Sequence, residues 1–180
     1  MRIRLATDTD ERRRRFEQVV LPHLDAASNL ARWLTRSAPE AEDVVQEAML
    51  RAFRAFDGLR GEDAKPWLLA IVRNCHYTAA GKGKRNVPLP EDDQAALVAE
   101  DKSPEEAAVQ TDTGRKLDRV IAMLPEEFRE TLILREMEDM SYREIAEITG
   151  APIGTVMSRL ARARAVLREK WMAEMKETAP

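Results

Sequence analysis

Cysteine, histidine and aromatic residues are scarce in this 180-residue chain, and it has no long apolar run. Its one cysteine, Cys75, excludes an intrachain disulfide and favours a reducing compartment. No stretch reaches the ~18 apolar residues that a membrane span needs, and the N-terminal segment lacks the apolar core of a signal peptide. We therefore expect a cytoplasmic protein with no membrane insertion.

The residue types that catalysis and metal binding need are also scarce. His23 and His76 are the only histidines, and neither a phosphate-binding glycine loop nor a metal-ligand spacing is present. Carboxylates are abundant, but they fall on polar helix faces or in a linker. We expect no catalytic residue, no metal and no cofactor. A metal or redox site at Cys75 and His76 is a minor alternative, because further ligands are missing.

Strand patterns are missing too, and helical patterns fill most of the chain. Aromatic residues make up only 5%, and β-branched residues never alternate over a useful window. Apolar residues instead recur every three or four positions, which indicates an all-α protein. The first helical stretch is expected at residues 10–36, with a break at Pro22, and the next helix follows a capping box at Ser37 and Glu40. Further helices are expected from Trp67, on both sides of Pro125 and over residues 142–171.

One segment, residues 86–112, differs from the rest in composition. It holds eight acidic residues and one lysine, a balance of −7, together with three prolines. Such a segment cannot bury enough apolar surface to fold alone, so we expect an acidic flexible linker. The linker separates two small helical domains, residues 10–85 and 113–176, each of which is only marginally stable by itself.

Residues 141–171 predict a helix-turn-helix. Ser141 and Glu144 have capping-box spacing, and Gly150 suits the left-handed end of the first helix. Pro152 suits the first turn of the second helix. On that helix the apolar residues form one stripe, which consists of Val156, Leu160, Ala163 and Leu167. A separate stripe carries two hydroxyls and two arginines, namely Thr155, Ser158, Arg159 and Arg162.

This polar stripe has the chemistry of a DNA-reading helix. Small hydroxyls allow a helix to approach the major groove closely, and arginines reach base edges or phosphates. The segment 153–171 holds five basic residues and one acidic residue, a balance of +4, although the whole chain carries −3. The alternative explanation is a solvated basic face on an ordinary bundle helix.

Two segments resemble bacterial RNA polymerase sigma factors of the extracytoplasmic-function (ECF) class. The stretch LPEEFRETLILREMEDMSYREIAEITGAPIGTVMSRLARARAVLRE is similar to their C-terminal domain, and AEDVVQEAMLRAFRAFDGLRGEDAKPWLLAIVRN to their N-terminal domain. The motifs LP-x-x-F-R, S-Y-x-E-I-A, G-T-V-x-S-R-L-x-R-A-R and D-V-V-Q-E are jointly specific. The resemblance implies a protein that binds core RNA polymerase through its β and β′ subunits, directs it to promoter DNA and helps to melt that DNA. It also implies an anti-sigma factor as a partner.

The resemblance assigns three binding surfaces. Thr155, Ser158, Arg159 and Arg162 would read the −35 element. The resemblance implies that Asp43, Gln46, Glu47 and Arg51 bind core polymerase. These residues lie off the expected buried stripe of Val45, Ala48, Ala52 and Phe56, so they are free for a partner. Trp67, Arg73, Asn74, Lys82, Lys84 and Arg85 would bind the −10 element, where the segment 65–85 has five basic residues and no acidic residue.

Some of these assignments have structural alternatives. We favour a core position for Trp67 over base stacking, and Asn74 either reads an extruded base or supports the loop before its helix. Ala70, Met157 and Ala161 depart from the family's pattern, which leaves the −35 sequence open. A conventional helix-turn-helix repressor or activator, which would bind DNA without polymerase, remains the main alternative function. A helical protein-binding adaptor is a further one, but it would not need the arginine stripe.

Overall fold

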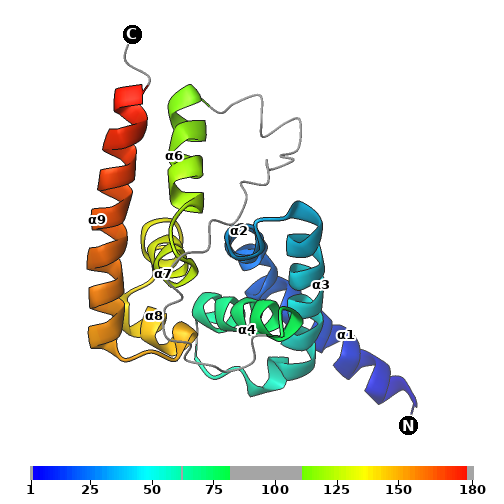
Figure 1. The fold of residues 1–180 in the computed structure, drawn as a ribbon. Coiled ribbons are helices and arrows are strands. Elements are labelled where there is room, and N and C mark those ends of the chain that lie inside the picture. The colour runs from blue at the N-terminus through cyan, green and yellow to red at the C-terminus, as the bar shows by residue number, and fades with distance from the viewer. Residues whose placement is uncertain (1, 62, 82–110, 178–180) are drawn as a thin grey trace.

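A computed structural model of the chain describes residues 2–61, 63–81 and 111–177, and within these ranges all regular structure is helical (Figure 1). The elements fall into two groups. The N-terminal unit consists of α1 (Arg2–Val19), η1 (Leu21–His23), α2 (Leu24–Thr35), α3 (Ala38–Ala55), η2 (Phe56–Gly58) and α4 (Ala64–Ala79). The C-terminal unit consists of α6 (Asp112–Ala122), α7 (Glu126–Glu136), α8 (Tyr142–Thr149) and α9 (Ile153–Glu177). The predicted all-α fold is confirmed.

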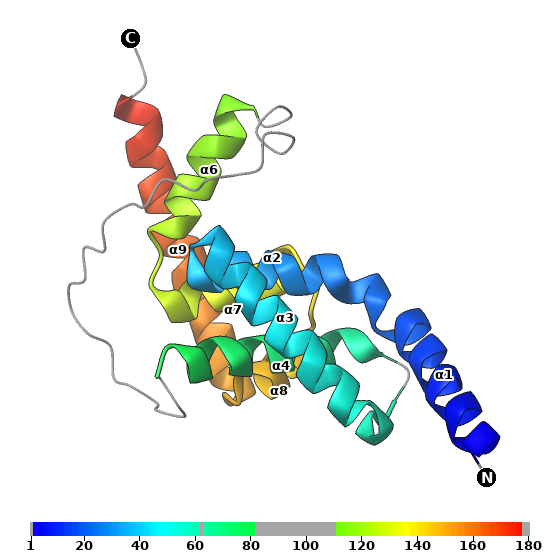
Figure 2. The same cartoon turned by 90° about the vertical axis from the view of Figure 1, so that its right-hand side faces the viewer.

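In the N-terminal unit, α2, α3 and α4 pack against one another around a small apolar core. The break expected at Pro22 is present as the turn η1, which separates α1 from α2. Helix α1 begins earlier than the sequence pattern predicted, and its N-terminal end projects away from the rest of the molecule (Figure 2). Leu30 of α2 and Leu68 and Leu69 of α4 are fully buried in this core.

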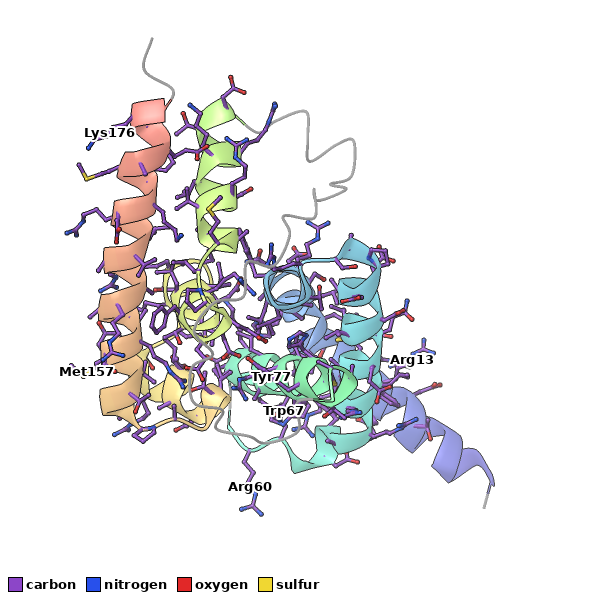
Figure 3. The ribbon with its side chains drawn as sticks, in the orientation of Figure 1. Arg13, Arg60, Trp67, Tyr77, Met157 and Lys176 are labelled. Carbon is purple, nitrogen blue, oxygen red and sulfur yellow. The ribbon has the colours of Figure 1, made fainter. Side chains whose placement is uncertain are left out.

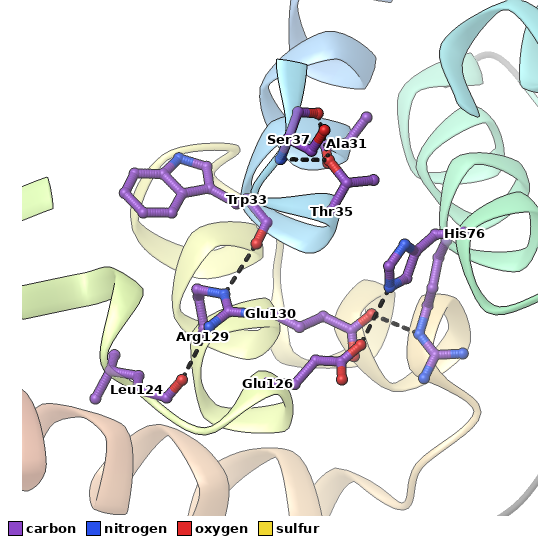
Figure 4. Close-up of polar contacts among 10 residues, drawn as sticks. Ala31, Trp33, Thr35, Ser37, His76, Leu124, Glu126, Arg129 and Glu130 are labelled. Atoms are coloured by element: carbon purple, nitrogen blue, oxygen red, sulfur yellow. Dashed lines mark hydrogen bonds and ion pairs between the residues drawn. The ribbon is translucent and has the colours of Figure 1, made fainter. Parts of the chain in front are cut away.

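The capping box expected at Ser37 and Glu40 is wrong. Ser37 does occupy the N-cap of α3, but its side chain makes no capping hydrogen bond. The hydroxyl of Thr35 organises the turn instead. Its Oγ1 lies 3.0 Å from the carbonyl oxygens of Ala31 and Ser37 and accepts the amide N–H of Ser37 at 3.3 Å (Figure 4). A threonine in the last turn of α2 has therefore taken the place of the cap that spacing alone suggested.

The helix-turn-helix in the C-terminal unit follows the prediction closely. Ser141 and Glu144 form a reciprocal capping box, in which the Ser141 amide donates to the Glu144 carboxylate at 2.7 Å. Gly150 ends α8 with φ of 67°, in the left-handed region that favours glycine. Pro152 immediately precedes α9, and its carbonyl accepts the Thr155 amide at 2.9 Å. The turn therefore sets the start of α9 as well as the end of α8.

The two units pack directly on each other. Helix α2 lies against α7, and α4 lies against α8, so that the buried apolar residues of both units form one continuous cluster (Figures 1 and 2). A unit of this size has difficulty burying enough apolar surface alone, and contact with the other unit adds to what it buries. Most of the expected linker lies outside the described residues; its last position, Asp112, already belongs to α6, which Thr111 caps.

Candidate nucleic-acid and polymerase interfaces

Helix α9 buries one stripe and presents another to solvent. Val156, Leu160 and Ala163 are buried, as predicted, and Leu167 is half-buried. On the polar side Ser158 and Arg162 are exposed, and Thr155 is half-buried. The Ser158 hydroxyl donates to the Thr155 carbonyl at 3.0 Å. Met157 is 53% exposed and points outward from α9, away from the other helices (Figure 3).

The two arginines of the polar stripe differ in their surroundings. Arg159 has only 17% of its side chain exposed and forms an ion pair with Glu127 of α7 at 3.0 Å. Arg162 is exposed, so its guanidinium is available to a base or a phosphate. Arg164, one turn from Leu160, is tied to Glu136 at 2.6 Å, and the bond raises the pKa of its guanidinium. The structure therefore singles out Arg162 within the predicted −35 set.

The residues of helix α4 that were predicted to bind the −10 element lie on two different faces of the helix. Trp67 and Asn74 lie seven positions apart, about two helical turns, so they share a face. Asn74 is exposed, and its side-chain amide makes no hydrogen bond to any other residue in the described ranges. Trp67 is half-buried against the apolar core, in line with the favoured core position, and it keeps part of its ring accessible. Lys82, Lys84 and Arg85 lie outside the described residues.

Arg73 lies on the other face, against the C-terminal unit. Its Nε donates to Oε1 of Glu130 in α7 at 2.6 Å, and its guanidinium stacks over the Tyr77 ring at 4.5 Å. A cation held in this way is not free for DNA in the present arrangement. Arg73 was assigned to the −10 element as one of the five basic residues of segment 65–85. Adjacent residues of a helix point about 100° apart, so Arg73 does not share the face of Asn74.

The loop before α4 is anchored by a residue that sequence reasoning did not identify. The Arg12 guanidinium of α1 reaches both carboxylate oxygens of Asp57 at 3.0 Å and the Phe53 carbonyl at 2.6 Å. It also lies 4.6 Å from the centre of the Phe53 ring. The start of the loop is therefore fixed to α1, across 45 positions of sequence.

The face of α3 predicted to bind polymerase is accessible. Ala41, Val44, Ala48 and Ala52 form the buried stripe, and Val45, which was expected to be buried, is only half-buried. Asp43 and Gln46 are exposed. Glu47 and Arg51 are half-buried and pair with each other at 2.6 Å, a bond that raises the pKa of Arg51. Leu50 lies among them and is 53% exposed, so the face offers both charge and apolar surface.

The most heavily buried polar groups lie on α7, where sequence reasoning found only a helix. Arg129 is buried and donates to the Trp33 carbonyl and the Leu124 carbonyl, both at 2.9 Å (Figure 4). It also donates to the Ala122 carbonyl at 3.2 Å. Burial lowers the pKa of its guanidinium. Arg129 is the arginine of the LP-x-x-F-R motif. It ties the α6–α7 turn to the last turn of α2, which has carbonyls without intrahelical partners.

Three carboxylates face α4: two belong to α7, and one belongs to the segment that follows α7. Glu130 pairs with Arg73 at 2.6 Å, Glu126 with His76 at 3.1 Å, and Glu138 with Lys65 at 3.2 Å. Asn29 of α2 also donates to Glu138 at 2.6 Å. We call this set the α4–α7 polar interface; its members are Lys65, Arg73, His76, Glu126, Glu130 and Glu138.

Glu130 lies at the centre of this interface. Its side chain is 1% exposed, and burial raises the pKa of its carboxyl, an effect that Arg73 opposes. Its Oε2 has no hydrogen-bond partner among the described residues. The sequence contains one indication that α7 is buried on more than one side. Leu132, Ile133 and Leu134 are three consecutive apolar residues, so other elements must cover more than one face of this helix.

The described residues hold no group of three or more side chains that could bind a metal ion. Cys75 is buried, and burial raises the pKa of its thiol, while His76 is engaged by Glu126. None of the helices in the described ranges is long and apolar enough to cross a membrane.

The fold and its exposed faces define a helix-turn-helix protein with a second helical unit that offers separate polar surfaces. Comparison with known proteins gives the family. Residues 19–86 match the model for sigma-70 region 2, and residues 114–167 match the model for sigma-70 region 4. The chain belongs to the sigma-70 family, in the ECF class of RNA polymerase sigma factors.

Individual relatives cover most of the chain. It is 34% identical to the RNA polymerase sigma-H factor of Pseudomonas aeruginosa over 161 residues, which make up 84% of this chain and 83% of the relative. It is 36% identical to the ECF RNA polymerase sigma-E factor of Escherichia coli K12 over 156 residues, 78% and 80% of the two chains. Among solved structures, the sigma factor RpoE in complex with the anti-sigma factor NepR from Bartonella quintana superposes with a TM-score of 0.67 and 28% identity, over 87% of this chain and 96% of that one.

Proposed function

We propose that α9 reads the −35 element through Thr155, Ser158, Arg159 and Arg162, with Arg162 making the main contact. The observation that carries this proposal is the exposed Arg162 and Ser158 on the side of α9 opposite its buried stripe. A short capped helix, a glycine turn and a second helix with free polar side chains form the standard geometry for major-groove docking. Arginine reads guanine through two hydrogen bonds, and serine allows close approach.

The N-terminal unit supplies the second DNA contact. Asn74 is exposed, with a free amide that can both donate to and accept from the edge of an extruded base of the −10 element. Trp67 shares its face and keeps part of its ring accessible for contact with that strand. Lys82, Lys84 and Arg85 add positive charge after α4, where they would neutralise phosphates.

The exposed face of α3 is the docking site for core polymerase. Asp43, Gln46, Glu47 and Arg51 correspond to the family's contact with the β′ subunit, and none of them is needed to bury the apolar core. The chain therefore directs polymerase to the promoter and captures the −10 strand, and core polymerase, in the cytoplasm, catalyses RNA synthesis. An anti-sigma protein is the expected regulator, since the solved relative RpoE is bound to one.

Promoter binding with and without core polymerase tests this proposal. The free chain should bind promoter duplex poorly, and addition of core polymerase should give tight and sequence-specific binding. The acidic segment 86–112, with its balance of −7, works against DNA binding by the free chain. Specific binding to a palindrome without polymerase would instead establish the chain as a conventional repressor or activator.

A further inference from the structure

Helix α1 is attached to the end of α3 through an aromatic contact. Phe16 is buried, and its ring meets the rings of Phe53 and Phe56 edge-on, with centroid distances of 5.1 Å and 5.3 Å. Arg12 lies four positions before Phe16, on the same face of α1, so it reaches the same end of α3. Both α1 residues precede the segment 19–86 that matches sigma-70 region 2, so that match does not include them.

Arg12 joins this end of α3 to the segment that follows it, residues 57–61. Its terminal nitrogen donates at 2.6 Å to the carbonyl of Phe53, in the last turn of α3, where a helix offers its carbonyls no partner. Its Nε lies 3.0 Å from both carboxylate oxygens of Asp57, the first residue of the segment. We call Arg12, Phe53 and Asp57 the α1 anchor.

The α1 anchor is stronger than an ordinary surface ion pair. Asp57 is 74% exposed, and an exposed pair by itself contributes little stability. The Arg12 side chain is only 28% exposed, and its guanidinium also lies over the Phe53 ring, 4.6 Å from the ring centre. One side chain thus holds a main-chain carbonyl, an aromatic ring and a carboxylate, so the position of Asp57 is set relative to α1 and α3 together.

Residues 57–61 lead toward the α4 face proposed for the −10 strand. Arg60 is exposed and points outward from this segment (Figure 3). Trp67 lies in the first turn of α4, and Asn74 lies two turns further along the same face. A strand bound along this face would pass from Asn74 to Trp67 and then meet the segment. The conformation of the segment therefore affects how well this end of the strand is bound.

We propose that Arg12 is a positioning residue for the −10 strand, which keeps residues 57–61 in the conformation that receives the strand beside Trp67. This inference rests on the proposed function of α4. Arg12 acts through Asp57 and the Phe53 carbonyl and makes no contact with DNA itself. A segment that is ordered before it meets DNA loses less conformational entropy on binding, so the anchor strengthens strand capture.

Asp57 gives the anchor a signature that simple charge effects cannot produce. If charge alone mattered, Asp57→Ala would strengthen strand binding, because it removes a carboxylate that repels phosphates. In the α1 anchor the same change removes a partner of Arg12, so it should weaken strand binding. Arg12→Ala should weaken strand binding as well. Two opposite charges whose removal acts in the same direction identify an anchor, not separate contacts with phosphate.

The assay measures binding of a single-stranded oligonucleotide by the full-length chain in complex with core polymerase. The oligonucleotide carries the −10 element of a promoter found by start-site mapping, and a strand with the same bases in scrambled order is the reference. Arg12→Ala should weaken binding of the −10 strand about tenfold, the loss expected when binding must order about one more backbone residue. Asp57→Ala should weaken it by a smaller factor, because the bond to the Phe53 carbonyl remains. Binding of the scrambled strand should change little in either variant.

Arg13→Ala is the matched control. Arg13 is exposed, is adjacent to Arg12 and pairs with Glu17 inside α1, so its loss removes the same charge without touching the anchor. This variant should bind the −10 strand as the parent does. Arg12→Lys keeps the charge but not the planar set of donors, so its affinity should lie between those of the parent and Arg12→Ala. Circular dichroism and core affinity should be unchanged in every variant; if Arg12→Ala does not fold, Asp57→Ala makes the same test at an exposed position.

Amide hydrogen exchange on the free chain measures the anchor independently of DNA. In the parent the Leu59 amide donates to the Phe56 carbonyl at 3.0 Å, and residues 57–61 should exchange faster in Arg12→Ala and Asp57→Ala. Folded variants with unchanged exchange, or with parent affinity for the −10 strand, would overturn the positioning role of Arg12, as would stronger strand binding by Asp57→Ala. A parent complex that does not distinguish the −10 strand from the scrambled strand would instead refute the proposed function of α4.

Discussion

At the residue scale, Arg129 is a buried charged side chain that joins α2 to the α6–α7 turn. Its guanidinium is buried and bonded to main-chain carbonyls from α2 and from the α6–α7 turn. These carbonyls lie at helix ends and turns, where the helices themselves supply no partner. Arginine suits the position because its several donors have a fixed planar geometry and because it keeps its charge when buried.

Replacement of Arg129 by alanine should lower the free energy of unfolding by about 3 kcal/mol, because buried carbonyls would lose charged donors. Arg143 is an exposed arginine of α8 and provides the control. Arg143→Ala should change stability by less than about 0.5 kcal/mol. Urea unfolding of both variants checks the difference; equal effects would mean that the Arg129 bonds do not contribute net stability.

Arg162 can be tested against its neighbour Arg164 on α9. Arg162→Ala should cost ~1–3 kcal/mol of promoter binding by the polymerase complex and relax the preference at one −35 position, as expected for loss of a base contact. Arg164→Ala should have a smaller effect, since Arg164 is held by Glu136. Binding to a panel of −35 variants at several salt concentrations is the measurement. Uniform weakening with a shallower salt slope would make Arg162 a phosphate contact instead.

At the element scale, the two serine caps show how one sequence pattern can give two structures. Ser141 and Ser37 both precede a helix, and both have glutamate three positions on. Only Ser141 forms the reciprocal box, because at Ser37 the Thr35 hydroxyl occupies the turn. Spacing identifies the start of the helix correctly in both cases, but it does not determine which side chain bonds the exposed amides.

This difference has a measurable consequence. Ser141→Ala should destabilise the chain by about 1 kcal/mol, the usual cost of losing an N-cap. Ser37→Ala should cost less than about 0.5 kcal/mol, because no capping hydrogen bond is lost. Thermal unfolding of the two variants under identical conditions gives the comparison. A larger loss for Ser37→Ala would contradict the assignment of the α2–α3 turn to Thr35.

The exposed face of α3 can be tested as a unit. Gln46→Ala/Glu47→Ala should weaken core polymerase binding while leaving helicity unchanged, since both residues lie off the buried stripe. The control is Glu17→Ala/Gln18→Ala on α1, which removes the same two side-chain types from another exposed face. Fluorescence titration with core polymerase and circular dichroism are the two readouts. Unfolding of the α3 variant would assign that face a structural role.

At the scale of the whole molecule, patterns within one helix were predictable and contacts between the units were not. The buried stripe of α9 follows from the helical period, because every residue of that stripe faces the same neighbours. The pair of Arg73 and Glu130 joins residues 57 positions apart on different units. Local spacing carries no information on such a pair. Arg73 was consequently assigned to DNA alone, whereas the structure shows it bound to a carboxylate.

Each of the two small units contributes apolar residues that the other unit helps to bury. Apolar residues of both contribute to one cluster, and buried charges align the helices where the units meet. Removal of one partner from a buried ion pair leaves an uncompensated charge, so loss of either member of such a pair destabilises the contact between the units.

In vitro transcription with core polymerase and the purified chain tests the central claim most directly. Genomic fragments serve as templates, and the start sites are mapped. If this chain directs polymerase to promoters, initiation will require it, and the mapped sites will share −35 and −10 elements at a fixed spacing. Initiation that is the same with and without the chain, or start sites without a shared upstream element, would contradict its function as a sigma factor.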